Sequence, residues 1–260
     1  MSEYWSEGTQ PLPSLNHPWL RADGLFETLK SVKGRTFFLH RHLQRLSDSA
    51  NELLFTSPKI DEIAVKINQM VSQDCFDRGR LRLTYFSNGQ YLITHHPINL
   101  NPDEKFRLGL SRYPRFSQGL LSGHKTLAYT QASFGLRVAE LEGYDDLLYL
   151  NERGEVVETG LANIVIEINS ELITPPLHSG PLPGIVRAVL LEWFPQIQER
   201  MLHLDELKEA SGLYLLSSIR ELHPVEAFND GLTLAHFEES DQVRQIRSEY
   251  LKRSESDADS

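Results

Sequence analysis

Four short segments of this 260-residue chain carry residues whose types and positions could do chemistry. Lys125 lies in a glycine-flanked loop just before a predicted helix, unlike a lysine in a charged surface run. Glu158 ends a predicted strand, which places a carboxylate at the strand terminus. Pro183 and Gly184 open another predicted helix, whose first N–H groups lack intrahelical partners and suit a phosphate. Arg45, on an earlier helix, could supply a bidentate phosphate contact.

Other familiar patterns are missing or wrongly spaced. The run GLLSGHKT at 119–126 has three residues between its glycines and a histidine before its lysine, whereas a P-loop needs four and a lysine directly after the second glycine. His95 and His96 are neighbours at the end of a predicted strand, so their side chains face opposite ways. That arrangement favours a structural or solvated role over a shared metal ion. The sequence therefore predicts no metal site.

The composition narrows the class of protein. With 26 basic and 36 acidic residues the formal net charge is −10, so we expect no nucleic-acid or membrane partner, because such binding depends on excess positive charge. One cysteine, Cys75, excludes a disulfide framework and a four-thiolate zinc site. The first residues lack the basic and apolar regions of a signal peptide, and no apolar run approaches the length of a membrane span. We expect a soluble, cytoplasmic protein.

The elements that must position these residues follow from hydrophobic periodicity. Residues 36–39 predict a short strand, and residues 40–54 predict a helix with apolar side chains three and four positions apart. A second helix at 60–71 has the same pattern. The strand-like runs 80–86 and 90–96 flank an Asn-Gly pair, which predicts a β-hairpin.

The second part of the chain follows a proline- and glycine-punctuated segment, 112–124, which we interpret as an interdomain connection. A helix is predicted at 130–144, with a glycine near its end as the stop signal. The remaining predictions are strands at 146–151, 155–159, 163–168, 171–175 and 212–218, and helices at 185–194 and 241–251. Strands that mostly pair locally indicate an α+β fold. We expect two domains, 1–111 and 125–252, and a disordered tail at 253–260.

Six segments, in this order and spacing, resemble the class IV aminotransferase family of pyridoxal-phosphate (PLP) enzymes, also called fold type IV. They extend from about Asp23 to Val225 and read DGLFETL, FFLHRHLQRLSDSA, HKTLAY, GEVVETGLANIVI, ITPPLHSGPLPGIVR and LSSIRELHPV. The resemblance implies a two-domain α+β fold with mixed sheets, a barrel-like C-terminal domain and flanking helices. It also implies pyridoxal 5′-phosphate as cofactor, a small-molecule substrate and a homodimer.

The resemblance also implies residue roles. Lys125 matches the catalytic lysine that binds the cofactor as a Schiff base and moves protons at the substrate's α-carbon. Glu158 matches the carboxylate that pairs with the pyridine nitrogen, where an anion helps the ring to accept electrons. Asn163 matches a position near the site. Four residues match those that bind the phosphate, namely Arg45, Ser218, Ile185 and Val186. Tyr129 matches a residue that contacts the phenolic oxygen of the ring.

Some positions depart from the family pattern. Val186 stands where a threonine is usual, so a hydroxyl donor to the phosphate is lost while the N–H remains. Ala128 replaces a common asparagine. Tyr85 and Phe86 replace an Arg-Gly turn that family members use for the substrate carboxylate. The substrate is therefore the least determined property.

Three activities compete within the family: 4-amino-4-deoxychorismate lyase, branched-chain aminotransferase and D-amino-acid aminotransferase. HKTLAY and VVETGLANI look most like the lyase group, which releases pyruvate to give 4-aminobenzoate, a precursor in folate biosynthesis. A non-catalytic PLP-binding relative is a further alternative. The side chains put forward for substrate binding are Arg21, Arg80, Arg82, Ile219 and Arg220.

Overall fold

The computed structural model describes residues 17–101 and 103–256, which divide into two compact units. Among these residues, unit 1 comprises 17–99, His124–Ala128 and 253–256. Among the same residues, unit 2 comprises 100–101, 103–123 and Tyr129–Lys252. Each unit is built around its own hydrophobic core.

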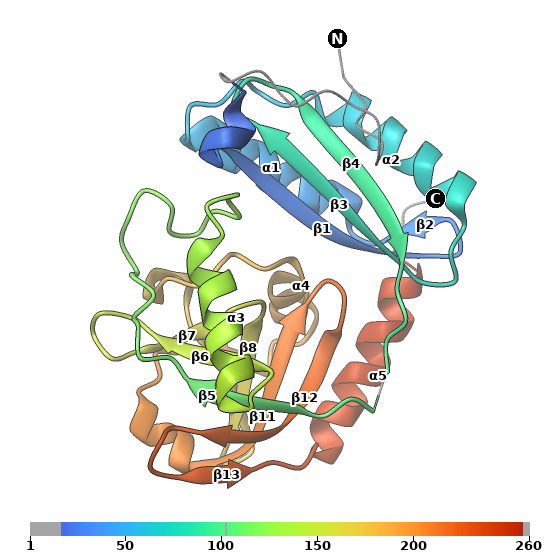
Figure 1. Ribbon diagram of the computed structural model, residues 1–260. Helices are drawn as coiled ribbons and strands as arrows, with labels where there is room; N and C mark the ends of the chain where they lie inside the picture. The colour runs from blue at the N-terminus through green and yellow to red at the C-terminus, as the bar shows by residue number, and fades with distance from the viewer. Residues whose placement is uncertain (1–16, 102, 257–260) are drawn as a thin grey trace. The chain divides into compact units, whose positions relative to one another are not determined.

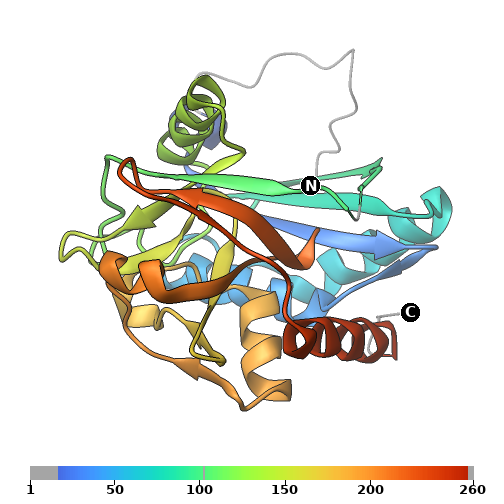
Figure 2. The same cartoon turned by 90° about the horizontal axis from the view of Figure 1, so that it is seen from below.

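Unit 1 is a four-stranded antiparallel sheet with two helices on one face, as both views show (Figure 1 and Figure 2). Its strand order is β2-β1-β3-β4. The elements are η1 (Pro18–Arg21), β1 (Gly24–Val32), β2 (Arg35–Thr36), α1 (Leu39–Glu52), α2 (Ile60–Asp74), β3 (Gly79–Phe86) and β4 (Tyr91–Pro97). The two predicted helices and the predicted hairpin are confirmed.

The core of unit 1 forms where the apolar faces of the helices meet the sheet. Leu43 and Leu46 of α1 and Ile63 and Ile67 of α2 are buried, as the three- and four-residue spacing predicts. The predicted strand at 36–39 is wrong beyond Thr36. The reason is that Phe38 adopts a left-handed backbone conformation with φ of 57° and α1 starts at the next residue.

The segment that carries Lys125 runs along the edge of β1. The Phe26 N–H donates to Lys125 O at 2.8 Å, and the Leu127 N–H donates to Gly24 O at 2.8 Å. Thr126 forms an antiparallel bridge with Leu25. Backbone hydrogen bonds on both sides of the lysine therefore fix its position beside β1.

Unit 2 contains a nine-stranded mixed sheet and the remaining helices. Its main strand order is β10-β9-β8-β11-β12-β5-β6-β7, and β13 pairs with β12. The strands are β5 (Phe106–Leu110), β6 (Asp146–Leu150), β7 (Val156–Thr159), β8 (Asn163–Ile168), β9 (Glu171–Thr174), β10 (Ile197–Glu199), β11 (Ala210–Ser217), β12 (Glu221–Asn229) and β13 (Leu234–His236). The helices are α3 (Thr130–Glu142), η2 (Leu177–Ser179), α4 (Ile185–Trp193), η3 (Leu204–Glu209) and α5 (Asp241–Ser256), of which residues 253–256 belong to unit 1. Gly143 caps α3 with φ of 79°, which confirms the predicted stop.

The large sheet curls into a half-barrel. β7 and β8 stand well apart in the strand order, yet the Thr159 N–H at the end of β7 donates to Ala162 O, just before β8, at 2.8 Å. A flat sheet could not bring these two strand ends into one tight turn. The core inside this curve is built from strand residues such as Leu148, Ile164 and Leu213. The mixed, barrel-like architecture expected from the resemblance is confirmed.

The compact units differ from the predicted domain ranges. Residues 100–111 belong to unit 2 because β5 pairs with β6 and β12 there, and His124–Ala128 belong to unit 1 because they pair with β1. Helix α5 continues to Ser256, so the first half of the predicted tail is helical. Residues 257–260 lie outside the described part of the chain. None of the helices in that described part is long and apolar enough to cross a membrane.

Candidate active site

Glu158 lies near the end of β7, where the backbone after it is held by a second carboxylate. Asp146 accepts hydrogen bonds from the N–H groups of Gly160 and Leu161, both at 3.1 Å. Burial raises the pKa of Asp146 even though these N–H groups favour its ionised form. The turn that follows Glu158 is therefore anchored from β6, and Glu158 itself is buried.

Two side chains hold the Glu158 carboxylate. Arg115 donates from Nη1 to Glu158 Oε1, and Asn163 donates from Nδ2 to Glu158 Oε2 at 2.8 Å. Arg115 also lies over the Tyr149 ring, 4.9 Å from its centroid. Burial alone would lower the pKa of Arg115, but the adjacent Glu158 outweighs it and raises that pKa. Both groups of the pair therefore have a partner of opposite charge in a largely buried setting.

Arg115 is not among the residues that the sequence predicts for the site. It lies within the predicted connection 112–124, a segment without regular secondary structure, so no periodic pattern marked it. A usable signal was present: an arginine between a proline and a phenylalanine, ten positions before Lys125. Its pairing with Glu158 becomes visible only when the fold joins residues 43 positions apart.

Asn163 links Glu158 to the opening of α4. Its Nδ2 also donates to Leu182 O at 2.9 Å, two residues before the helix cap. A Cβ on Gly184, the N-cap residue, would lie 1.8 Å from Asn163 Oδ1, so any other residue there would force Asn163 or the helix opening to shift. The buried residues Ile185 and Val186 then begin the helix, whose cap makes no side-chain hydrogen bond. The carboxylate and the helix opening are thus joined by one side chain.

The other predicted residues of unit 2 lie in two turns. Ser218 and Ile219 are half-buried in the turn between β11 and β12. Arg220, in the same turn, donates to Glu104 Oε2 at 2.6 Å and stacks over the Phe106 ring at 4.6 Å. Tyr129 is half-buried at the N-cap of α3.

In unit 1, Lys125 and Arg82 share one aromatic ring. The Lys125 amine lies 4.4 Å from the Phe26 ring centroid, and the Arg82 guanidinium carbon lies 3.8 Å from it. Arg80 lies on the same face of the sheet as Arg82, because alternate strand residues share a face, and it is exposed. The predicted lysine and one predicted substrate-binding arginine therefore contact the same ring.

Arg45 is tightly paired within unit 1. It donates from Nε and Nη2 to the two oxygens of Glu27, at 2.9 and 2.6 Å, and His42 donates from Nδ1 to Glu27 Oε2 at 2.6 Å. Burial opposes ionisation of Glu27, but the Arg45 charge and the His42 hydrogen bond outweigh it and lower the pKa of Glu27 to about 2. Burial also lowers the pKa of His42, against the pull of Glu27. Glu27 thus orients the predicted phosphate-binding arginine.

One further polar group resembles a catalytic arrangement, but its serine is fully buried. Ser31, His95 and Asp74 are hydrogen-bonded in series at 2.7 Å each, which resembles a hydrolytic triad, but Ser31 has no exposed surface and cannot meet a substrate. The His95 side chain is buried and His96 is exposed, as their alternation predicts.

Arg21, another residue put forward for substrate binding, is exposed on η1. Among the described residues, no three His, Cys, Asp or Glu side chains are grouped to hold a metal ion.

Comparison with known proteins defines the class of protein. The family model "Amino-transferase class IV" matches residues 24–228, nearly the extent predicted from the six segments. The chain therefore belongs to the class IV aminotransferase family. It is 27% identical, over 232 residues, to a bifunctional aminodeoxychorismate lyase / D-amino acid transaminase from Mycobacterium tuberculosis, covering 77% of this chain and 80% of the relative.

Solved structures show the same fold. A hypothetical aminotransferase from M. tuberculosis in its PLP-bound form superposes with a TM-score of 0.84 at 24% identity, covering 97% of this chain and 96% of the other. The branched-chain aminotransferase of Thermoproteus uzoniensis, crystallised with norvaline, gives 0.83 at 22% identity, covering 94% and 90%. At these identities the likeness establishes the fold type IV architecture.

Proposed function

We propose that this protein is a PLP-dependent enzyme and that its reaction is the lyase reaction on 4-amino-4-deoxychorismate. Membership of the class IV family supports the cofactor. The observation that carries the proposal is Asn163, which ties the buried Glu158 carboxylate to the opening of α4. PLP has a ring nitrogen at one end and a phosphate at another, and a carboxylate joined rigidly to a helix N-terminus matches these two groups in kind.

The donor set of the chain fits the cofactor. Lys125 supplies the amine that holds it covalently, and Arg45 supplies a phosphate contact oriented by Glu27. The first N–H groups of α4, at Ile185 and Val186, supply further phosphate donors. Ser218 and Tyr129 are the proposed contacts to the phosphate and to the phenolic oxygen.

The chain's own residues then divide the chemistry. When bound, the cofactor supplies a ring that stabilises negative charge at the substrate's α-carbon. Lys125 moves a proton at that carbon. Glu158 keeps a proton on the ring nitrogen, and Arg115 with Asn163 keeps Glu158 in place for that role. Phe26 helps to orient the Lys125 amine through a cation–π contact with its ring.

The charge beside Lys125 supports a substrate with more than one carboxylate. Arg82 shares the Phe26 ring with the lysine, and Arg80 follows on the same sheet face. Lys30 adds a third cation on this face, 4.0 Å from the Phe37 centroid. A branched aliphatic side chain would gain nothing from such a surface, whereas the two carboxylates of aminodeoxychorismate would. Arg220 is the weaker candidate because Glu104 already pairs with it.

The test is a product assay. Incubated with aminodeoxychorismate and PLP, the protein should release 4-aminobenzoate and pyruvate with no 2-oxo-acid acceptor. Arg82→Leu should raise KM by about tenfold or more, the scale of losing one charged hydrogen-bonding partner. Arg35→Leu, which removes an exposed arginine on β2, is the matched control and should leave KM within about twofold.

Two alternatives remain as outcomes of that assay. Turnover that requires an amino donor and a 2-oxo acid would assign the protein as an aminotransferase of branched-chain or D-amino acids, and the lyase proposal would fall. A colourless protein that takes up no added PLP would remove both enzyme assignments. A yellow protein without either activity would identify a non-catalytic PLP-binding relative.

We also propose that the protein is a homodimer. Tyr113, Phe116 and Leu120 expose more than half of their surface on the segment between β5 and α3. Large apolar side chains gathered on one exposed segment are typical of a protein contact. Sedimentation equilibrium should give about twice the monomer mass; a monomer at micromolar concentration would contradict this. The cytoplasmic location stays a prediction.

A further inference from the structure

The segment 112–123 has no helix or strand, yet it carries Arg115, which must meet Glu158. Two contacts hold it close to that residue. The Arg115 N–H donates to Leu150 O, at the end of β6, at 2.8 Å. Two positions later, Ser117 is held by the turn between β6 and β7.

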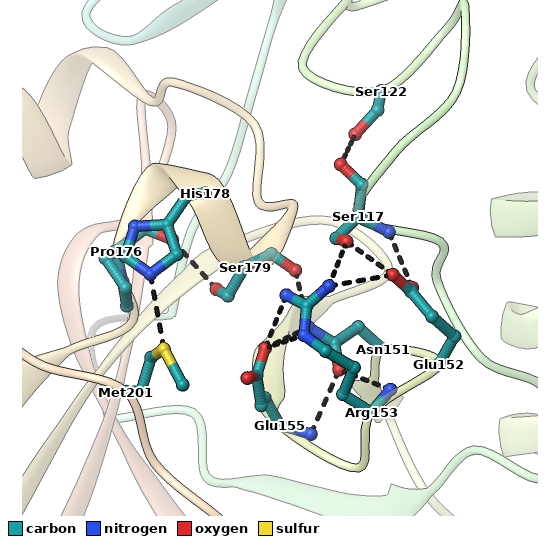
Figure 3. Close-up of polar contacts among 10 residues, drawn as sticks. All are labelled: Ser117, Ser122, Asn151, Glu152, Arg153, Glu155, Pro176, His178, Ser179 and Met201. Carbon is teal, nitrogen blue, oxygen red and sulfur yellow. Dashed lines mark hydrogen bonds and ion pairs between the residues drawn. The ribbon is translucent and has the colours of Figure 1, made fainter.

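The contacts at Ser117 are charge-assisted and converge from one turn. Glu152 accepts from the Ser117 N–H at 2.9 Å and from its hydroxyl at 2.5 Å. Arg153 donates from Nη1 to the Ser117 hydroxyl oxygen at 2.9 Å and to Glu152 at 3.0 Å. Figure 3 shows the Arg153 guanidinium lying between Ser117, Glu152 and Glu155. The Ser122 hydroxyl adds a bond to Ser117 O at 3.1 Å.

The turn itself is rigid at its base. Glu155 is buried and accepts from Arg153 Nη2 at 2.7 Å and from Asn151 Nδ2 at 2.6 Å. Asn151 Oδ1 in turn accepts from the N–H groups of Arg153 and Glu155. Glu155 stands three positions before Glu158 on the same run of chain that forms β7. The stretch of chain that carries Glu158 therefore also carries Glu152 and Arg153, whose side chains hold Ser117.

We propose that the turn Asn151–Glu155 is a clamp: through Ser117, Glu152 and Arg153 act as positioning residues that keep Arg115 against Glu158. The inference deepens the proposed function and rests on it for the role of Glu158. Glu152 and Arg153 are largely exposed, and exposed ion pairs contribute little to global stability. Their effect is therefore local. They keep the segment 112–123 ordered, and they act on the environment of the cofactor ring.

Hydrogen–deuterium exchange without added cofactor tests the clamp. In Glu152→Ala the amide protons of Arg115 and Ser117 should exchange about five- to tenfold faster than in the wild type, the scale of losing one hydrogen bond. Glu152→Gln keeps an acceptor oxygen and should restore much of the protection. Asp205→Ala removes an exposed carboxylate paired with Lys208 on η3 and should leave this segment unchanged. Unchanged exchange in Glu152→Ala would overturn the proposal.

The pH titration of the visible absorbance of bound PLP tests whether the clamp acts through Arg115. Arg115→Met should shift its midpoint by about half a pH unit or more, and Glu152→Ala should shift it in the same direction by less. Arg115→Lys, which keeps the charge, should lie between Arg115→Met and the wild type. Faster exchange in Glu152→Ala with a wild-type midpoint would overturn the proposal. If the wild type takes up no PLP, the proposed function fails, while the exchange experiment still decides whether the clamp exists.

Discussion

Asn163 donates from Nδ2 to Glu158 Oε2 at 2.8 Å, and the same nitrogen reaches Leu182 O at 2.9 Å. The Asn163 side chain is buried, so water does not compete for these two hydrogen bonds. One side chain therefore sets the spacing between the carboxylate and the start of α4, and it gives the first test of the site.

Asn163→Ala should leave Glu158 Oε2 and Leu182 O short of a donor. We expect the free energy of unfolding to fall by about 1–3 kcal/mol and PLP affinity to fall by about tenfold. Urea denaturation and a PLP titration measure the two effects. Gln196→Ala removes an exposed amide and should change stability by less than about 0.5 kcal/mol. Equal effects of the two substitutions would contradict the linking role of Asn163.

Gly184→Ala tests the close approach at the cap of α4. The new Cβ would overlap Asn163 Oδ1, so either the asparagine or the helix opening must move. A loss of stability of about 1–3 kcal/mol and weaker PLP binding are expected. Gly119→Ala is the control, because nothing lies within 4 Å of its added Cβ. Wild-type PLP affinity in Gly184→Ala would show that the cap does not position the phosphate contact.

Glu27→Gln tests the buried group around Arg45. Removing the charge leaves the arginine without its anionic partner, so we expect a loss of about 3–5 kcal/mol in the free energy of unfolding. The exposed pair of Lys59 and Glu62 provides the comparison, and Glu62→Gln should cost less than about 1 kcal/mol. Urea unfolding followed by circular dichroism measures both. A loss below about 1 kcal/mol in Glu27→Gln would refute the ion-pair account.

The free energy of unfolding should decrease in two steps as the pH is lowered, and both steps come from residues of unit 1. His42 has a pKa below its ordinary 6.5 in the folded state, so below about pH 6.5 the unfolded chain binds the extra proton and stability declines. Glu27 has a pKa of about 2 instead of 4.5, so its roughly 3 kcal/mol is present above about pH 4.5 and is lost as the pH falls towards 2.

His42→Gln separates the first of these steps. Urea unfolding between about pH 7.5 and about pH 5 should show a shallower decline in the variant than in the wild type, whatever its absolute stability. Parallel curves would mean that His42 does not contribute to the decline.

The sequence predicts the periodic elements well but not the internal strands β1 and β5. Both helices of unit 1 follow from apolar spacing, and the hairpin follows from its Asn-Gly turn. β1 carries no alternating pattern, because burial on both faces includes polar side chains such as Glu27 and Ser31, and it was noticed only as a motif. β5 was missed because it is short and its parallel partners, β6 and β12, lie far along the chain.

The candidate site was predicted in the same uneven way. Motif positions such as Lys125 and Glu158 can be identified from local sequence. Their partners Phe26 and Arg115 cannot, because each is brought close only by tertiary pairing. The pairing of Arg220 with Glu104 was likewise invisible, since 116 positions separate the two residues.

Covalent attachment of PLP to Lys125 can be measured by reducing the PLP-loaded protein with borohydride and locating the pyridoxyl group by peptide mass spectrometry. We expect the peptide containing Lys125 to carry the group, and Lys125→Ala to give no covalent label and to lose turnover. Attachment to another lysine such as Lys30, or no attachment in a protein that has bound PLP, would show that Lys125 is not the residue that holds the cofactor.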